Sequence, residues 1–283
     1  MALTVNTNTT SLGVQKNLNR ASDALSTSMT RLSSGLKINS AKDDAAGLQI
    51  ATRMTSQIRG QTMAIKNAND GISIAQTAEG AMQEQTNILQ RMRELAVQSR
   101  NDSNSAQDRD ALNKEFQSML SEIDRIASST QLNGKDLLNG TASVMTFQVG
   151  SNTGGANQIK ISLSDSMMTT GALSALSGKT ITGADSAAAE AAFSGAVTAI
   201  DSALQTINSS RADLGAAQNR LTSTINNLQN INENAEAARG RVQDTDFAAE
   251  TAQLTKQQTL QQASTSVLAQ ANQLPSAVLK LLG

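Results

Sequence analysis

The sequence lacks cysteine, histidine, tryptophan and tyrosine altogether, and its 283 residues include one proline and four phenylalanines. Without cysteine and histidine, the chain can hold no thiol nucleophile, imidazole base, zinc-finger site or disulfide scaffold. Because Pro275 is the one proline, almost no position in the chain forbids a helix. Aromatic residues make up 1% of the chain and apolar residues 39%, so the core must consist mainly of Leu, Ile, Val, Met and Ala.

The chain also lacks an excess of charge of either sign and a long apolar run. Its 23 basic and 24 acidic residues give a net charge of −1, which provides no basic field for nucleic acid. No apolar run approaches the roughly 18 residues of a membrane-spanning helix. The segment Met1–Asn8 contains neither a charged leader nor an apolar stretch. We therefore expect no nucleic-acid partner, no membrane-spanning segment and no cleaved secretion signal.

Both ends of the chain carry apolar residues at helical spacing. From Val14 to Leu36 they fall three or four residues apart, and from Leu260 onward they recur every seven residues. Both patterns are typical of a coiled-coil seam. The predicted seam consists of Leu18, Leu25, Leu32, Leu36, Leu260, Val267, Leu274 and Leu281. Because the two ends carry matching seams, we expect residues 1–43 and 245–283 to pair as an inner coiled-coil domain.

This terminal pair is expected to be marginally stable by itself. Two thin helices bury apolar side chains on one face each, so burial and hydrogen bonds barely offset the conformational entropy that ordering costs. We therefore expect the two ends to become ordered when copies of the chain assemble. The C-terminal part of the seam leaves an alternative open, in which it is an ordinary core stripe within one chain.

Between the two ends, residues 44–244 are expected to form a helical bundle. Residues 45–100 carry two apolar stripes on one helix, and two stripes require burial on two sides. A turn signal at Asn101–Ser105 precedes a shorter helix that must fold back beside the first. The longest helical register of the chain then extends from Phe193 to Val242.

The middle of the chain has a different pattern. Alternating apolar residues on both sides of Gly150–Gly155 predict a β-hairpin near residues 142–165. Residues 164–190 are rich in Ser, Thr, Gly and Ala without a clear period, so we expect an exposed connection there. The predicted fold class is therefore all-α, a long rod of coiled coil and helical bundle with one small β-hairpin.

No group of residues in the sequence points to catalysis or to a bound cofactor. The carboxylate pairs Asp43/Asp44 and Asp108/Asp110 lie at helix starts or turns, where capping explains them. The glycine pair Gly154–Gly155 lacks the following Lys-Ser/Thr of a phosphate loop. We therefore expect no enzyme activity, no cofactor and no metal.

Several blocks of this sequence resemble bacterial flagellin. They are Met1–Asn8, Arg31–Leu48, Asp70–Gly80, Leu89–Gln98, Glu122–Ile126 and Ser266–Gln273. The resemblance covers roughly residues 1–140 and 190–283. Many flagellins carry large variable outer domains between their two helical arms, whereas only residues 141–190 separate the arms here. The chain therefore resembles a short, core-only flagellin.

The resemblance implies a function and a set of partners. The chain would be a structural subunit that polymerises with its own copies into the flagellar filament of a swimming bacterium, with the two paired ends in the filament core. Export would be unfolded, through the flagellar type III pathway and without a cleaved signal peptide, to an extracellular location. A flagellar export chaperone, the filament cap and the hook-junction proteins would be its further partners.

The resemblance also implies a recognition patch. Seven residues match the positions at which toll-like receptor five contacts flagellins, namely Gln90, Arg91, Leu95, Glu115, Ile200, Asp201 and Leu204. In the alternative interpretation, Leu95 and Leu204 are simply residues of the bundle. Arg91 and Glu115 would then belong to a solvated face.

Two other functions compete with the filament subunit. A hook–filament junction protein shares the helical ends, but the complete set of central blocks argues against it. In a secreted adhesin or immune-active binding protein, filament formation would be secondary. Polymerisation induced by salt or by filament seeds distinguishes the filament subunit from the binding protein.

Overall fold

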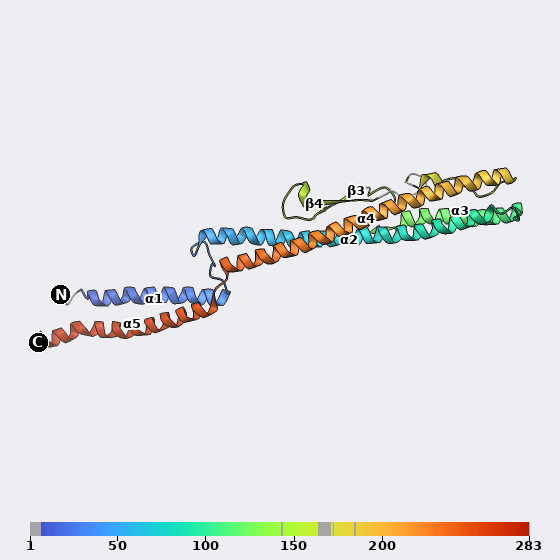
Figure 1. The fold of residues 1–283 in the computed structure, drawn as a ribbon. Coiled ribbons are helices and arrows are strands. Elements are labelled where there is room, and N and C mark those ends of the chain that lie inside the picture. The colour runs from blue at the N-terminus through green and yellow to red at the C-terminus, as the bar shows by residue number, and fades with distance from the viewer. Residues whose placement is uncertain (1–6, 143, 164–170, 172, 184, 283) are drawn as a thin grey trace. The chain divides into compact units, whose positions relative to one another are not determined.

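The computed structural model describes all residues except 1–6, 143, 164–170, 172, 184 and 283. Within the described residues, five α-helices account for most of the chain: α1 (Thr9–Ser34), α2 (Ala45–Ser99), α3 (Ala106–Ser129), α4 (Ser186–Gln243) and α5 (Phe247–Leu282). The strands are β1 (Gln131–Leu132), β2 (Lys135–Asp136), β3 (Val144–Gln148) and β4 (Gln158–Ser162), and two short 3₁₀ helices are η1 (Gly155–Asn157) and η2 (Ser174–Leu176). The all-α class is confirmed (Figure 1).

The chain divides into two compact units, which we call the terminal unit and the bundle unit. The terminal unit comprises Met1–Ile58 and Glu233–Gly283, and the bundle unit comprises Arg59–Asn232. The domains expected from the sequence, an inner domain of residues 1–43 and 245–283 around a bundle of 44–244, concern the assembled filament and stay a prediction.

In the terminal unit, α1 and α5 pack side by side (Figure 1). Helix α1 ends at Gly35, which has φ 73°, a left-handed conformation that glycine adopts without steric cost. The chain segments that follow α1 and precede α5 are joined directly, since the Lys37 amide donates to the Gln243 carbonyl at 2.7 Å. The Thr245 amide also donates to the Gly35 carbonyl at 3.0 Å.

In the bundle unit, α2, α3 and α4 enclose one apolar core. Its fully buried large side chains on the helices include Met82, Leu89, Met92, Leu95, Phe116 and Ile123. Helix α3 begins with a capping box in which the Ser105 hydroxyl and the Asp108 carboxylate each accept a backbone N–H of the other residue. Hydrogen bonds from the Ser105 side chain and then from its backbone lower the pKa of Asp108.

The hairpin expected near residues 142–165 is present. Strands β3 and β4 are antiparallel, with Val144 opposite Ser162 and Gln148 opposite Gln158. Phe147 of β3 packs closely on α2 at Gly71, where an added Cβ would lie 3.2 Å from the Phe147 ring. Glycine at this position therefore lets the hairpin approach the helix.

The structure contains a second, shorter hairpin that the sequence pattern did not reveal. Strands β1 and β2 have two residues each, too few for apolar alternation to be recognised. Their turn is Asn133–Gly134, with φ of 51° and 71°, which is the residue pair that favours a tight hairpin turn. The dipeptide Asn133–Gly134 is therefore the sequence feature from which this hairpin could have been predicted.

The expected exposed connection at residues 164–190 is wrong for part of its length. Leu173, Leu176 and Ile181 are all buried in the core of the bundle unit. Each is an isolated apolar residue among small polar ones, so no periodicity in the sequence marks its burial. Residues from Ser186 onward already belong to α4, and 164–170, 172 and 184 lie outside the described residues.

Candidate assembly and recognition surfaces

The N-terminal part of the predicted seam lies in the contact between α1 and α5. Leu18, Leu25 and Leu32 are half-buried along one stripe of α1. The same stripe contains the buried small residues Ala21 and Ser28. Leu36, also half-buried, follows α1 and forms a β-bridge with Asp244.

The C-terminal part of the predicted seam does not face α1. Leu260 and Val267 are 44% and 46% exposed. The half-buried and buried residues of α5 form a different stripe, which consists of Leu254, Gln257, Gln261, Ser264, Leu268 and Ala271. The expectation that the two seams pair with each other is therefore wrong for Leu260 and Val267, as is the alternative that they form a core stripe within one chain. The side chains of Leu274 and Leu281 lie outside the described residues.

This correction has a simple physical reason. Half of the six residues in the inward stripe of α5 are glutamine or serine, so its apolar residues are interrupted and a search for apolar periodicity selects the outer stripe. Amide and hydroxyl side chains can line such a contact because they hydrogen-bond without carrying a charge. The apolar residues at heptad spacing are left on the surface of the single chain.

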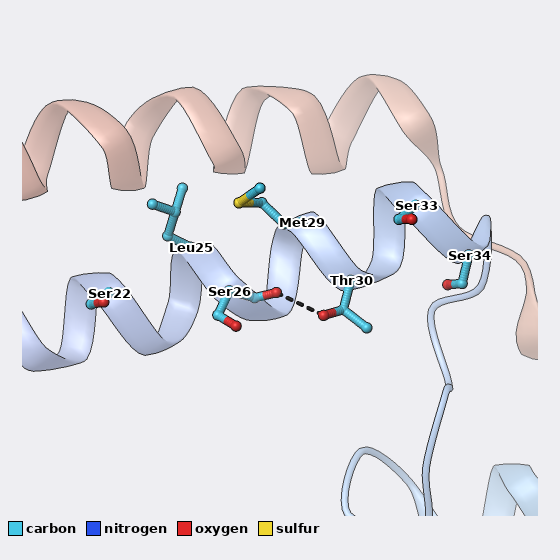
Figure 2. Close-up of a pocket in the computed structure, with 7 residues that line it drawn as sticks. All are labelled: Ser22, Leu25, Ser26, Met29, Thr30, Ser33 and Ser34. Atoms are coloured by element: carbon cyan, nitrogen blue, oxygen red, sulfur yellow. Dashed lines mark hydrogen bonds between the residues drawn. The ribbon is translucent and has the colours of Figure 1, made fainter.

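Further large apolar side chains are exposed on the terminal unit. Leu12 and Met29 of α1 and Phe247 of α5 are each more than half exposed. Met29 and Leu25 lie beside small hydroxyl side chains along a shallow groove on α1, and the hydroxyl of Thr30 bonds within the helix to the Ser26 carbonyl (Figure 2). These side chains, with Leu260 and Val267, are the large apolar groups that the terminal unit leaves in contact with water.

In the bundle unit, the predicted recognition patch separates into two ion pairs and a buried part. Arg91 of α2 donates to Glu115 of α3 at 3.0 Å and to Glu94 at 2.9 Å. The hydrogen bonds to Glu94 and then Glu115 raise the pKa of Arg91. Gln90 is exposed beside Arg91. These residues form one charged surface across α2 and α3.

Asp201 belongs to a different pair. Its carboxylate accepts from Arg93 of α2 at 3.1 Å, which links α2 to α4. Because successive residues are about 100° apart around a helix, Arg91 and Arg93 lie about 200° apart on α2. The sequence pattern did not include Arg93 and Glu94 in the patch. The spacing of three residues between Arg91 and Glu94 could have predicted their ion pair on one helix. No local pattern could have paired Arg93 with Asp201, because they are 108 positions apart.

The apolar members of the patch lie in the core. Leu95 and Ile200 have no exposed surface, and Leu204 is half-buried against the same core. In the single chain, Leu95 is thus a core residue of the bundle unit. What the single chain presents to solvent is Gln90, the Arg91–Glu115 pair and the Arg93–Asp201 pair.

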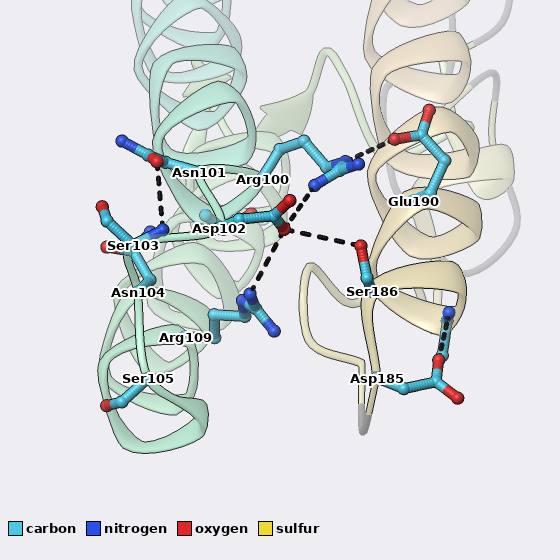
Figure 3. Close-up of polar contacts among 12 residues, drawn as sticks. Arg100, Asn101, Asp102, Ser103, Asn104, Ser105, Arg109, Asp185, Ser186 and Glu190 are labelled. Atoms are coloured by element: carbon cyan, nitrogen blue, oxygen red, sulfur yellow. Dashed lines mark hydrogen bonds and ion pairs between the residues drawn. The ribbon is translucent and has the colours of Figure 1, made fainter.

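A polar network joins the ends of α2 and α4 through the turn that follows α2 (Figure 3). Arg100 contacts Glu190 and, at 2.8 Å, Asp102. Asp102 also faces the nearly buried Arg109 at 3.9 Å and the Ser186 hydroxyl at 3.5 Å. Two arginines are thus balanced by two carboxylates, which is the composition of a structural cross-link.

Three of the four carboxylates in the pairs Asp43/Asp44 and Asp108/Asp110 accept capping hydrogen bonds, namely Asp43, Asp44 and Asp108. Asp43 accepts the backbone N–H groups of Ser40 and Asn39, which lower its pKa in that order of importance. Asp44 accepts the Gly47 amide at 2.9 Å. Among the described residues no group of three or more acidic residues is arranged to hold a metal ion. The same residues include no helix that is both long and apolar enough to cross a bilayer.

Comparisons with known proteins agree over nearly the whole chain. The description "bacterial flagellin N-terminal helical region" matches residues 5–143, and "bacterial flagellin C-terminal helical region" matches residues 197–282. Flagellin D of Vibrio anguillarum is 41% identical over 377 aligned positions, and flagellin B of Vibrio cholerae is 40% identical over 378. Both alignments cover 100% of each chain.

Among solved structures, a putative flagellar hook-associated protein from Vibrio parahaemolyticus shares the fold. Its TM-score is 0.60 at 15% identity, covering 71% of this chain and 100% of that one. The flagellin of Bacillus cereus is 32% identical, with a TM-score of 0.47, and covers 58% of this chain and 88% of its own.

The fold consists mainly of long packed helices, and the described residues hold no cluster arranged for a metal ion. The chain belongs to the bacterial flagellins, a family of structural proteins and not of enzymes. It is a subunit of the extracellular flagellar filament, the helical polymer that serves motility. Its 283 residues, in alignments of 377 positions, are consistent with a short, core-only form.

Proposed function

We propose that copies of this flagellin polymerise through the terminal unit, with residues 1–43 and 245–283 forming the core of the filament. The observation that carries the proposal is the exposure of Leu260 and Val267, which lie seven residues apart on one face of α5 and away from α1. Because an exposed apolar stripe is stabilised by burial, a neighbouring copy that covers it contributes a favourable term to assembly. Leu274 and Leu281 continue the same heptad spacing.

The N-terminal seam has a different role in this proposal. Leu18, Leu25 and Leu32 lie in the contact of α1 with α5 within one copy, and Leu36 bridges to Asp244 just before α5. The outer residues of both helices then contact neighbours. Leu12 and Met29, each more than half exposed, are the apolar side chains of α1 that a neighbouring copy can cover.

The order of the terminal helices should depend on assembly. In the isolated monomer we expect the backbone amides of α1 and α5 to exchange with solvent much faster than those of residues 59–96 in α2, because the pair buries little apolar surface. In filaments the same amides should become protected. Hydrogen exchange followed by mass spectrometry measures both states, and residues 59–96 serve as the internal control. Equal protection of α1, α5 and α2 in the monomer would contradict coupled ordering.

We further propose that toll-like receptor five recognises the monomer through the charged surface of α2 and α3. Gln90, Arg91 and Glu115 supply its exposed hydrogen-bonding groups, and Asp201 with Arg93 supplies a second contact. Leu95 and Ile200 support these residues from the core, and Leu204 lies partly at the surface.

Replacing Arg91 and Glu115 together by alanine should weaken receptor activation by at least about tenfold, as expected when a central charged contact of an interface is removed. Response of reporter cells to purified monomer is the measurement. The matched control replaces Arg125 and Glu122, another exposed ion pair on α3, and should respond like the wild type. A wild-type monomer without activity, or equal loss in both variants, would overturn the recognition site.

Membership of the flagellin family also supports a set of partners. We propose that a flagellar export chaperone, the filament cap and the hook-junction proteins contact this chain, and that it leaves the cell through the flagellar type III pathway without cleavage of a signal peptide. Marginal stability of the terminal helices suits export in an unfolded state. Comparison of the intact mass of filament subunits with the mass of the full chain tests the absence of cleavage.

A further inference from the structure

At its far end, where α1 begins, the α1–α5 pair is joined by the side chains of Asn8 and Ser11. Asn8 precedes the helix and has two contacts: its Oδ1 accepts the Ser11 amide at 3.0 Å, and its Nδ2 donates to the Ala271 carbonyl at 2.8 Å. The Ser11 hydroxyl donates to Oδ1 of Asn272 at 2.7 Å. One amide side chain therefore starts α1 and at the same time attaches it to α5.

This junction lies at the opposite end of the pair from the backbone connection. The near end is held by the hydrogen bonds of Lys37 with Gln243 and by the ion pair of Arg31 with Glu250 at 3.7 Å. The two ends are separated by about 24 residues of α1, or about 36 Å at the rise of an α-helix. The near-end contacts therefore cannot by themselves keep the start of α1 on α5.

Apolar packing contributes little to holding the start of α1 on α5. Of the α5 stripe, Ser264, Leu268 and Ala271 are the residues nearest this end, and Leu268 is the one large apolar side chain among them. Polar groups behave differently, because a buried donor or acceptor that loses its partner costs free energy. Ser11 and Ala271 are both buried, at 7% and 3% exposure. The hydrogen bonds of Asn8 and Ser11 are therefore lost if the start of α1 moves away from Ala271 and Asn272.

We propose that Asn8 and Ser11 are positioning residues for filament assembly. By holding the start of α1 on α5, they fix the exposed Leu12 relative to the exposed Val267, which lies one turn before Ala271 on α5. A neighbouring copy then meets both apolar side chains in one defined arrangement. This inference rests on the proposed function of the terminal unit as the polymerisation surface.

The two roles of Asn8 can be separated by substitution. Aspartate caps a helix as well as asparagine does, but its carboxylate cannot donate to the Ala271 carbonyl. Asn8→Asp therefore keeps the start of α1 and removes the attachment to α5, whereas Asn8→Ala removes both. Ser11→Ala removes the bond to Asn272 alone. Thr27→Ala is the matched control, because the exposed Thr27 hydroxyl bonds only to the Asp23 carbonyl of its own helix.

The experiment measures the critical concentration for seeded filament growth and the amide exchange of residues 268–272 in filaments. For Asn8→Asp and Ser11→Ala we expect an increase in critical concentration of about tenfold, equivalent to about 1.4 kcal/mol, and faster exchange at residues 268–272. Helix content by circular dichroism should remain that of the wild type, and Thr27→Ala should match the wild type in every measurement.

Two results would overturn the inference. If Asn8→Asp assembles and exchanges like the wild type, the attachment to α5 does not position the helices. If only Asn8→Ala assembles poorly, capping alone explains the effect. The proposed function fails separately: variants of Leu260 and Val267 that still assemble normally would refute the polymerisation surface, whereas blocked assembly of those variants together with normal assembly of Asn8→Asp would refute the positioning role alone.

Discussion

Replacing both Leu260 and Val267 by aspartate should abolish filament growth while the helices of the bundle unit remain intact in the monomer. In the single chain both side chains are almost half exposed, so the new carboxylates remain solvated and the fold is not penalised. In the filament the same carboxylates would be enclosed against a neighbouring copy, and burial of an unpaired charge costs several kcal/mol for each group. Light scattering after addition of wild-type filament fragments measures the growth.

The control for this experiment preserves volume and polarity. Leu260→Met with Val267→Ile keeps the stripe apolar, and such substitutions usually cost less than about 1.5 kcal/mol. We therefore expect this variant to grow from seeds at close to the wild-type rate. Growth of the double aspartate variant at the wild-type rate would show that this face of α5 stays solvated in the filament, and the polymerisation surface would have to lie elsewhere.

The second large effect concerns the core of the bundle unit. Phe116→Ala removes a fully buried aromatic side chain and should lower the free energy of unfolding by about 3–5 kcal/mol. For a unit of this size, a loss of 1 kcal/mol lowers the melting temperature by about 2–4 °C, so a decrease of roughly 10 °C is expected. Thermal unfolding followed by circular dichroism measures the change.

The chain offers a matched control in Phe247. This side chain is 56% exposed at the start of α5, so Phe247→Ala should change the unfolding free energy by about 0.5 kcal/mol or less. If Phe247 contacts a neighbouring copy, Phe247→Ala should weaken filament assembly more than Phe116→Ala does, although it destabilises the fold less. Equal melting temperatures for the two alanine variants would contradict the placement of Phe116 in the core.

Much of the fold follows from local features of the sequence. The scarcity of proline and the apolar period of 3.6 residues led to the long helices, and alternation around Gly150–Gly155 led to the β3–β4 hairpin. The turn signal at Asn101–Ser105 correctly marked the end of the residues that precede α3. These features succeed because they depend on residues within a few positions of one another. The family could also be inferred from the sequence, since its motifs are continuous blocks.

The candidate surfaces depended on contacts that local patterns do not contain. Heptad spacing located an apolar face on α5, but only the packed pair showed that this face turns outward and that glutamine and serine line the contact with α1. The pairing of Arg93 with Asp201 joins residues 108 positions apart, and Leu95 proved to be part of the core.

The sequence by itself therefore determined the helical class, the order of the elements and the membership of the flagellin family. The tertiary structure alone decided which stripe of α5 is covered, which members of the recognition patch reach solvent, and that Leu173, Leu176 and Ile181 are buried. The physical reason is that periodicity reports how a side chain is oriented around its own helix. Burial also depends on the element that packs against that side, and this partner comes from a distant part of the chain.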